Sequence, residues 1–229
     1  MSWDRYRAVL FDLDGVVTPT ATVHMRAWEV MFNDFLASYD PSQPPFTTAD
    51  YHAYVDGRPR YDGVRGFLAS RGITLPEERV IELGDKKNAA VNEVLRREGV
   101  AAYPGSLLLL DHLQSLSVPM AVVSSSANAV AVLTAAGILD RFAAIVDGKV
   151  AAAEHLPGKP NPDTFLHGAR LLGATAADSV VLEDAVSGVQ AGRAGDFGLV
   201  IGVDRGAGVP ALTEAGADVV VADLAELVP

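Results

Sequence analysis

The 229-residue sequence contains no cysteine. Disulfide bonds, zinc–thiolate sites and thiol nucleophiles are therefore excluded, and nothing points to an oxidising compartment. Long apolar runs are also absent. No stretch approaches the roughly 18 apolar residues of a membrane-spanning helix, and the amino-terminal MSWDRYRAVLFDLDG lacks the apolar segment of a signal peptide. We therefore expect a cytoplasmic protein with no membrane partner.

Basic residues are in the minority: 18 Lys and Arg stand against 29 Asp and Glu, for a formal net charge of −11. Such a field repels nucleic acid, so we expect no nucleic-acid partner, and any phosphate must be bound by a few local groups. Hydrophobic residues make up 49% and charged residues 21%, as in an ordinary globular protein. The length suits one large domain or one domain that carries an insertion.

Six short apolar runs of β-type composition recur along the chain, with helical patterns between them. Their apolar residues are mostly consecutive, which is typical of parallel strands covered on both faces. We therefore predict an α/β fold built on a doubly wound parallel sheet. The predicted strands are Ala8 to Phe11, Met120 to Ser124, Ala143 to Val146, Ser179 to Leu182, Leu199 to Val203 and Asp218 to Val221.

The interval between the first two predicted strands is too long for an ordinary crossover, since about 100 residues separate them. Two stretches in it, HMRAWEVMFNDFLASY and ERVIELGDKKNAAVNEVLRREG, have helical periodicity, and the proline-rich PSQPP lies between them. We predict a helical cap domain over residues 20–97, inserted into a core domain of residues 1–19 and 98–229. The cap should stand over the carboxyl edge of the sheet, where open α/β folds bind ligands.

Two acids, Asp12 and Asp14, follow the first predicted strand and precede a glycine. At a strand end both carboxylates can face the ligand crevice, although Asp and Gly after a strand often form only a turn. Adjacent Glu183 and Asp184 end another apolar run, and neighbouring carboxylates repel each other unless a cation lies close to them. Together the two acidic pairs predict a site for a hard, oxygen-preferring cation.

Groups suited to phosphate end two further segments. The run VPMAVVSSSAN precedes a helical stretch, where hydroxyl and free N–H groups can bind phosphate or simply cap the helix. Lys159 stands among three prolines in LPGKPNPD, so a stiff backbone presents its ammonium group, which suits phosphate as a point charge. Four strand ends thus combine metal ligands, phosphate donors and a lysine.

Asp-x-Asp-Gly, a serine-bearing strand end, Lys-Pro and Glu-Asp, in this order, resemble the four motifs of the haloacid dehalogenase superfamily, which has a Rossmann-like core. The resemblance spans nearly the whole chain, and the sequence looks most like the β-phosphoglucomutase branch, whose helical cap follows the first motif. GVVTPT with its downstream His and Arg-Ala-Trp, the cap Lys-Asn, the loop from Gly57 to Arg60 and the serine-rich SSSAN are all similar to that branch.

The resemblance implies that Asp12 attacks phosphorus to form an aspartyl-phosphate, while Asp14 gives a proton to the leaving sugar oxygen and later takes one back. Ser124 and Lys159 would hold the phosphate oxygens that do not react. The resemblance also implies Mg²⁺ as the cofactor. Its ligands would be the carboxylates of Asp12, Glu183 and Asp184 and the backbone carbonyl of Asp14.

The resemblance also assigns substrate contacts to the cap. Arg60 would bind the phosphate that is not reacting, and His24 would help to couple sugar binding to Asp14. A lone His or Trp in an amphipathic helix is equally explained by packing. The substrate-binding residues that we predict are Thr20, His24, Trp28, Gly57, Arg60, Lys87, Asn88, Ser124, Ser125, Ser126 and Asn128.

We predict a phosphomutase that interconverts β-D-glucose 1-phosphate and glucose 6-phosphate through a 1,6-bisphosphate, and that acts as a monomer on this small sugar phosphate. A Mg-dependent phosphatase of the same superfamily shares every core residue, so hydrolysis stays open as the alternative. Pro19 stands where the resembled pattern usually has Asp, and proline in the linker between cap and core can alter cap closure. A non-catalytic module is the third possibility, which the survival of all four motifs disfavours.

Overall fold

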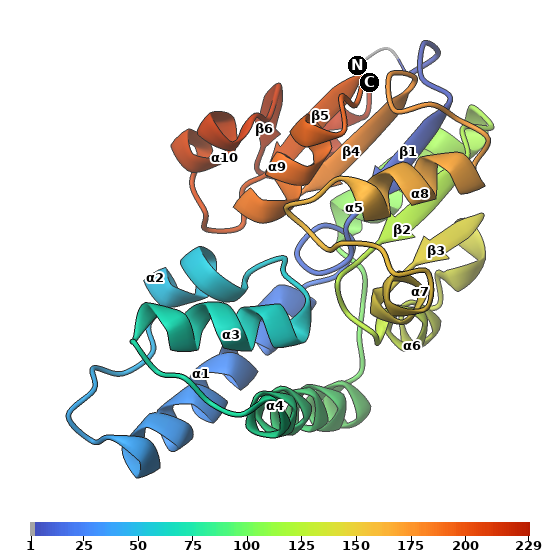
Figure 1. Cartoon of the computed structure of the whole chain (residues 1–229). Helices are drawn as coiled ribbons and strands as arrows, with labels where there is room; N and C mark the ends of the chain where they lie inside the picture. The colour runs from blue at the N-terminus through green and yellow to red at the C-terminus, as the bar shows by residue number, and fades with distance from the viewer. Residues whose placement is uncertain (1–2) are drawn as a thin grey trace.

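The computed structural model describes residues 3–229, so the first two residues of the predicted core domain lie outside the described residues. Across the described range, six strands form one sheet in which every pairing is parallel (Figure 1). Their spatial order is β3-β2-β1-β4-β5-β6. The strands are β1 (Ala8–Phe11), β2 (Met120–Val123), β3 (Ala144–Val146), β4 (Ser179–Glu183), β5 (Leu199–Val203) and β6 (Val219–Val221).

The central strand, β1, sets where the polar residues of the sheet edge meet. Phe11 pairs with Val122 of β2 on one side and with Leu182 of β4 on the other. Every residue of β1, β2, β4 and β5 is buried, which explains why these runs are continuously apolar. Because parallel strands end at the same edge, the residues that follow β1, β2 and β4 lie side by side.

The predicted strand bounds differ from the observed ones by one residue in four places. Ser124, Ala143 and Asp218 lie just outside the strands, although their backbone N–H groups still donate to Val146, Met120 and Val200 of neighbouring strands at 2.8–2.9 Å. Conversely, the predicted strand that ends at Leu182 is one residue longer in the structure, because Glu183 belongs to β4. The inter-strand hydrogen bonds therefore run one residue past the regular strands.

Helices cover both faces of the sheet, so the prediction of a doubly wound α/β core is confirmed. Alternate residues of β1 point to opposite faces: Phe11 packs with Leu110 of α5, and Leu10 packs with Phe165 of α8. The core helices are α5 (Pro104–Ser115), α6 (Ala129–Ala135), α7 (Gly148–Ala153), α8 (Asp163–Leu171), α9 (Val186–Ala194) and α10 (Val209–Ala215), with short turns η2 (Leu139–Arg141) and η3 (Leu224–Leu227).

A second group of helices lies apart from the sheet (Figure 1). The two longest, α1 and α4, occupy the stretches with predicted helical periodicity, whereas α3 was not predicted because Gly63 and Gly66 interrupt its pattern. The elements are α1 (Thr20–Tyr39), α2 (Thr48–Asp50), the π-helical turn η1 (Tyr51–Val55), α3 (Arg60–Ser70) and α4 (Glu77–Glu98).

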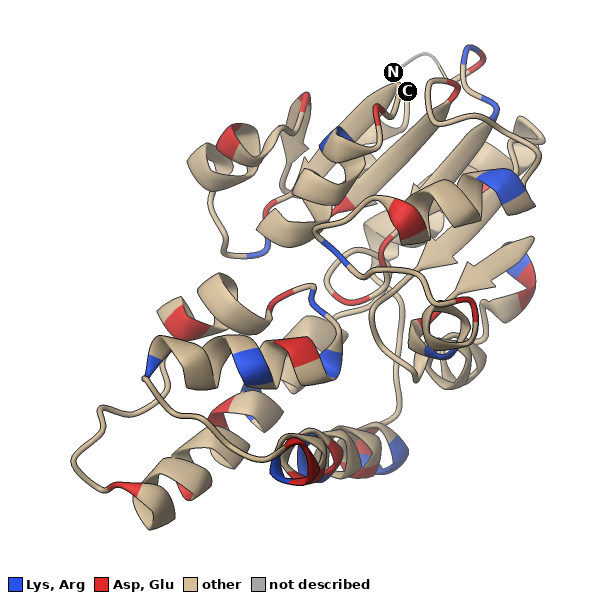
Figure 2. Ribbon diagram, in the orientation of Figure 1, with Lys and Arg blue, Asp and Glu red and all other residues tan. Residues whose placement is uncertain are grey.

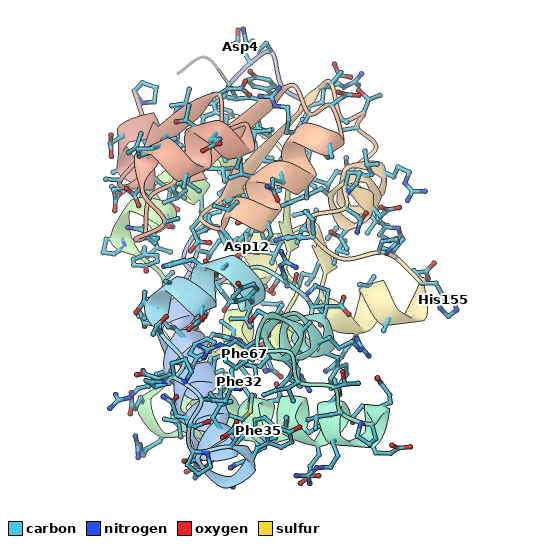
Figure 3. All side chains as sticks on the ribbon, turned by 60° about the vertical axis from the view of Figure 1, so that its left-hand side comes forward. Asp4, Asp12, Phe32, Phe35, Phe67 and His155 are labelled. Atoms are coloured by element: carbon cyan, nitrogen blue, oxygen red, sulfur yellow. The ribbon has the colours of Figure 1, made fainter. Side chains whose placement is uncertain are left out.

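These helices bury an aromatic cluster of their own. The ring of Phe32 lies 5.3 Å from Trp28, 5.1 Å from Phe46 and 4.2 Å from Phe67, measured between ring centroids. Figure 3 shows Phe32 and Phe67 deep in this helical part, well away from Asp12. Because the cluster is separate from the two clusters that flank the sheet, we propose the division into core and cap that the sequence predicts.

Charged residues of both signs are interspersed on the exposed face of the cap. Figure 2 shows both basic and acidic positions on α4, and Arg79–Glu82 and Glu93–Arg96 form ion pairs within one helical turn. Among the described residues, no helix is both long and apolar enough to span a membrane.

The aromatic cluster indicates which cap side chain contributes most to stability, as measured by substitution with alanine. We expect Phe32→Ala to lower the free energy of unfolding by about 3–5 kcal/mol, because the removed ring leaves a cavity among three other rings. The matched control is Val30→Ala on the same helix, whose side chain is exposed and which should change stability by less than about 0.5 kcal/mol. Urea denaturation of both variants measures the difference, and equal losses would contradict the prediction.

Candidate active site

A cavity of about 520 Å³ lies where the carboxyl edge of the sheet meets the cap. Asp12 marks this junction in Figure 3, between the sheet above and the helices below. Most of the predicted site residues line the cavity, whereas Thr20, Asn128, Lys159 and Glu183 do not. Those that do are Asp12, Asp14, His24, Trp28, Gly57, Arg60, Lys87, Asn88, Ser124, Ser125, Ser126 and Asp184.

Behind the cavity floor, Lys159 is buried between two carboxylates. Its Nζ lies 2.5 Å from Asp12 Oδ1, 2.6 Å from Glu183 Oε1 and 3.0 Å from the carbonyl oxygen of Val123. The second carboxylate oxygen of Glu183 accepts a hydrogen bond from Ala185 N at 2.9 Å. Lys159 therefore offsets the charge of both acids in this structure, and its role in holding phosphate oxygens stays a prediction.

Three buried acids, Asp12, Glu183 and Asp184, place carboxylate oxygens within 4.8 Å of one another. Burial raises the pKa of Asp12 to about 6 and that of Glu183 to about 7, although Lys159 opposes both shifts. Burial alone would lower the pKa of Lys159, but its two carboxylate neighbours outweigh that effect and raise it. One ammonium group cannot balance three carboxylates, so the cluster has the character of a cation site.

Asp184 gives the clearest sign that a cation belongs here. Its side chain accepts no hydrogen bond from any described residue, and burial followed by repulsion from Asp56 and Glu183 raises its pKa well above the usual value. A buried carboxylate without a donor is costly unless a metal ion takes its place. Gly15, with φ of +96°, approaches so closely that a Cβ there would strike the Asp184 carboxylate. The residues thus fit a divalent metal with oxygen ligands.

Asp14, the predicted acid/base, faces the cavity beside the metal cluster. Thr20 Oγ1 donates to one of its carboxylate oxygens, and Ser124 Oγ lies 3.4 Å from the other. Burial raises the pKa of Asp14, and the Thr20 hydrogen bond lowers it in part. Thr20 thus touches the acid/base rather than the cavity, so in this structure it positions Asp14.

A buried Lys–His pair continues from Asp14 into the cap. Lys87 Nζ lies 2.6 Å from His24 Nδ1 and 4.7 Å from the centre of the Trp28 ring, while His24 Nε2 lies 3.4 Å from Asp14 Oδ1. Burial lowers the pKa of Lys87 to about 7, and burial together with the Lys87 charge holds the pKa of His24 well below its usual value. A neutral His24 that accepts from Lys87 through Nδ1 carries its proton on Nε2, toward Asp14.

The cap is hydrogen-bonded to the core through residues that flank the cavity. Ser125 Oγ donates to the Gly57 carbonyl at 2.7 Å, Ser187 Oγ donates to the Asp56 carbonyl at 2.8 Å, and Asn128 Nδ2 donates to Asn88 Oδ1 at 2.9 Å. A Cβ on Gly57 would strike the Ser187 hydroxyl, so the two surfaces meet closely. Ser125 and Asn128, predicted to bind substrate, bind the cap in this closed arrangement.

Two arginines of the cap, Arg58 just before α3 and Arg60 at its first position, differ in the groups that they contact. Arg60 Nη1 lies 3.0 Å from Asp85 Oδ1, so its charge is partly engaged within the cap. Arg58 lines the same cavity, and although its backbone N–H donates to the Val55 carbonyl at 3.2 Å, its guanidinium group has no hydrogen-bond or ion-pair partner among residues 3–229. Arg58 was not among the predicted site residues, although a second basic residue two positions before Arg60 is a signal that could have identified it.

A parallel core defines the class of protein, because it gathers the acids at the carboxyl ends of β1 and β4, the serine after β2 and a lysine from the α7–α8 loop beneath the cap helices. The family model described as haloacid dehalogenase-like hydrolase matches residues 6–196, and the chain belongs to this family. More particularly, it is 46% identical to a β-phosphoglucomutase of Mycobacterium bovis, over 98% of this chain and 92% of that protein. The crystal structure of a β-phosphoglucomutase from Clostridium difficile has a TM-score of 0.81 and 25% identity, covering 97% of this chain and 93% of that one.

A relative of a different activity is also present. Hexitol phosphatase A of Escherichia coli is 30% identical, over 92% of this chain and 88% of that protein. Both the resemblance to the haloacid dehalogenase superfamily and the resemblance to its β-phosphoglucomutase branch are confirmed by these findings.

The buried lysine allows a direct test of the charge balance in the site. We expect Lys159→Met to lower the free energy of unfolding by about 3–5 kcal/mol in the absence of divalent cations, because it leaves Asp12 and Glu183 buried without a counter-charge. The matched control is Lys86→Met, which removes an exposed ammonium group 3.3 Å from Asp34 and should cost less than about 1 kcal/mol. Urea denaturation measures both, and similar losses would refute the prediction.

Proposed function

We propose that this chain is a phosphomutase that interconverts β-D-glucose 1-phosphate and glucose 6-phosphate through an aspartyl-phosphate on Asp12 and a glucose 1,6-bisphosphate. The observation that carries the proposal is the cavity itself. It joins Asp12 and Asp14 from the core to Arg58, Arg60 and Lys87 from the cap. A substrate with a phosphate at each end needs reacting groups for one phosphate and cationic groups for the other. The cavity provides both.

The first half-reaction follows from the contacts of the two acids. The Asp12 carboxylate, kept charged by Lys159, forms a bond to phosphorus as the bond from phosphorus to the sugar oxygen breaks. Asp14 has the raised pKa of a proton donor and gives its proton to the departing oxygen. We propose Mg²⁺ as the bound metal, held by Asp12, Asp184 and the Asp14 carbonyl, where it would neutralise charge on the transferring group.

Glu183 has a different place in this proposal. Both of its carboxylate oxygens are engaged, one by Lys159 and one by the N–H group of Ala185. We therefore assign Glu183 to orienting Lys159 and to adding negative charge beside the metal, in preference to direct ligation.

In the second half-reaction the bond from phosphorus to Asp12 breaks as a hydroxyl of the sugar phosphate bonds to phosphorus, and the hydroxyl proton passes to Asp14. The bisphosphate that results must turn around before Asp12 accepts its other phosphoryl group. The cap cations are placed to hold the phosphate that is not reacting, and the Lys87–His24 pair lies beside the proton-transferring Asp14. The predicted monomeric state stays a prediction.

Hydrolysis is the second candidate, supported by the presence of a hexitol phosphatase among the relatives. Water would then replace the sugar hydroxyl as acceptor while every core group keeps its role. Pro19 bears on this choice because it directly precedes α1 in the first linker, and its carbonyl accepts from Thr22 Oγ1 at 2.9 Å. Its effect on cap closure stays a prediction.

A coupled assay tests the proposed function. We expect the purified protein with Mg²⁺ and a trace of glucose 1,6-bisphosphate to convert β-glucose 1-phosphate to glucose 6-phosphate, with little release of inorganic phosphate. Asp14→Asn should lower the rate by roughly 100- to 10,000-fold, because it removes the proton donor. Asp12→Asn should abolish turnover, because an amide is not a nucleophile here. Rapid phosphate release without isomer formation would establish the phosphatase instead.

Substitution of Arg58 tests whether the cap cations bind the phosphate that is not reacting. We expect Arg58→Gln to lower kcat/KM for priming of Asp12 by glucose 1,6-bisphosphate by roughly 10- to 100-fold, the size of one charged hydrogen bond. Priming by acetyl phosphate should be unaffected, because that donor has no second phosphate. The control is Arg79→Gln, which changes an exposed arginine of the same cap. Equal losses with both phosphoryl donors would exclude a role for Arg58 at the distal phosphate.

A further inference from the structure

Arg205 lies in the loop after β5, outside the cavity lining, and touches three separate segments of the chain. Its Nε donates to the carbonyl oxygen of Gly15 at 2.9 Å, and its Nη1 donates to the carbonyl oxygen of Ala222 at 2.9 Å. The carbon of the guanidinium group lies 4.1 Å from the centre of the Tyr103 ring. One side chain thus makes two charge-assisted hydrogen bonds and a cation–π contact.

Two of these segments are the linkers between the core and the cap. Gly15 belongs to the first linker, between β1 and α1, and Tyr103 ends the second linker, between α4 and α5. The linkers also contact each other, because Tyr103 N donates to the carbonyl of Val17 at 3.0 Å. Ser106 Oγ of α5, just after the second linker, donates to the carbonyl of Val16 at 2.7 Å. Any movement of the cap relative to the sheet must be absorbed within these linkers.

The first linker also begins at the catalytic residues. Gly15 directly follows Asp14, and its backbone lies so close to the Asp184 carboxylate that a Cβ would not fit. A hydrogen bond to the Gly15 carbonyl therefore fixes the peptide that separates the acid/base from the hinge. The same guanidinium group also contacts the Tyr103 ring of the second linker. Arg205 therefore holds the loop after Asp14 and the second linker at the same time.

We propose that Arg205 is a positioning residue that holds both cap linkers in the closed geometry, so that the phosphoryl group on Asp12 passes to a sugar hydroxyl rather than to water. The inference rests on the proposed mutase function. In either transfer a bond from the acceptor oxygen to phosphorus forms, the bond from phosphorus to Asp12 breaks, and the acceptor's proton passes to Asp14. Looser linkers admit water as the acceptor, and inorganic phosphate is then the product.

The first test measures how the phosphoryl group is partitioned. We expect Arg205→Gln to raise the amount of inorganic phosphate released per glucose 6-phosphate formed by roughly tenfold or more, since it removes a charged hydrogen bond and the cation–π contact. The matched control is Arg193→Gln. Arg193 also donates to a backbone carbonyl, that of Gly216 at 2.8 Å, but contacts neither linker. It should lose stability without changing the partition.

Tyr103 supplies a second pair of variants. Tyr103→Phe keeps the ring under Arg205 and should keep the wild-type partition, whereas Tyr103→Leu removes the ring and should shift the partition toward phosphate release. Equal partition ratios in wild type, Arg205→Gln and Tyr103→Leu would overturn the proposal.

Hydrogen exchange of the full-length protein separates this inference from the proposed function. We expect Arg205→Gln, and not Arg193→Gln, to speed amide exchange in residues 13–18 and 99–104 by roughly tenfold, because linker opening becomes easier. A wild-type enzyme that forms no isomer would overturn the mutase assignment, and the exchange rates would still decide whether Arg205 holds the linkers. Unchanged exchange in both segments would show that it does not.

Discussion

The site depends on burying more negative charge than the protein itself neutralises. Asp12, Glu183 and Asp184 are brought together by the order of the central strands, and Lys159 contacts only two of them. Buried carboxylates without counter-charge are costly, so we infer that a bound cation completes the balance. We therefore include Lys159 in the proposed metal site. The three acids still lack positive charge, and a bound cation that supplies it would also stabilise charge during phosphoryl transfer.

The core and the cap contribute opposite charges to this balance. The sheet edge brings carboxylates, whereas the cap brings Arg58, Arg60 and Lys87 to the same cavity. This arrangement explains how a chain with a net charge of −11 can bind an anionic substrate, since the cations that matter are local and partly desolvated. It also links closure to chemistry, because the Lys87–His24 pair reaches the neighbourhood of Asp14 from the cap side.

Patterns within short segments made much of the fold and site predictable. Continuous apolar runs located all six strands to within one residue, and the acids that follow two of these runs were singled out from their position, with a turn as the alternative until the other motifs were considered. What the sequence could not show was the partner of each charged group. Lys159 was expected at the phosphate and lies between carboxylates, and Arg205 was not identified, because its contacts join segments up to 190 residues apart. Such contacts exist only in the folded chain, and α3 was missed because packing overrides its weak helix pattern.

The choice between sugar and water as acceptor must arise outside the catalytic core, because a mutase and a phosphatase of this family can share every core group. On our proposal, the acceptor is decided by how often the cap opens while Asp12 carries a phosphoryl group. That population changes tenfold for each 1.4 kcal/mol or so of linker stability, which is the scale of a few hydrogen bonds. Small changes at Gly15, Tyr103 or Pro19 are therefore expected to alter the ratio of isomer to released phosphate as much as a change in a substrate-binding residue. On this proposal, the residues that determine the product of this chain need not touch the substrate.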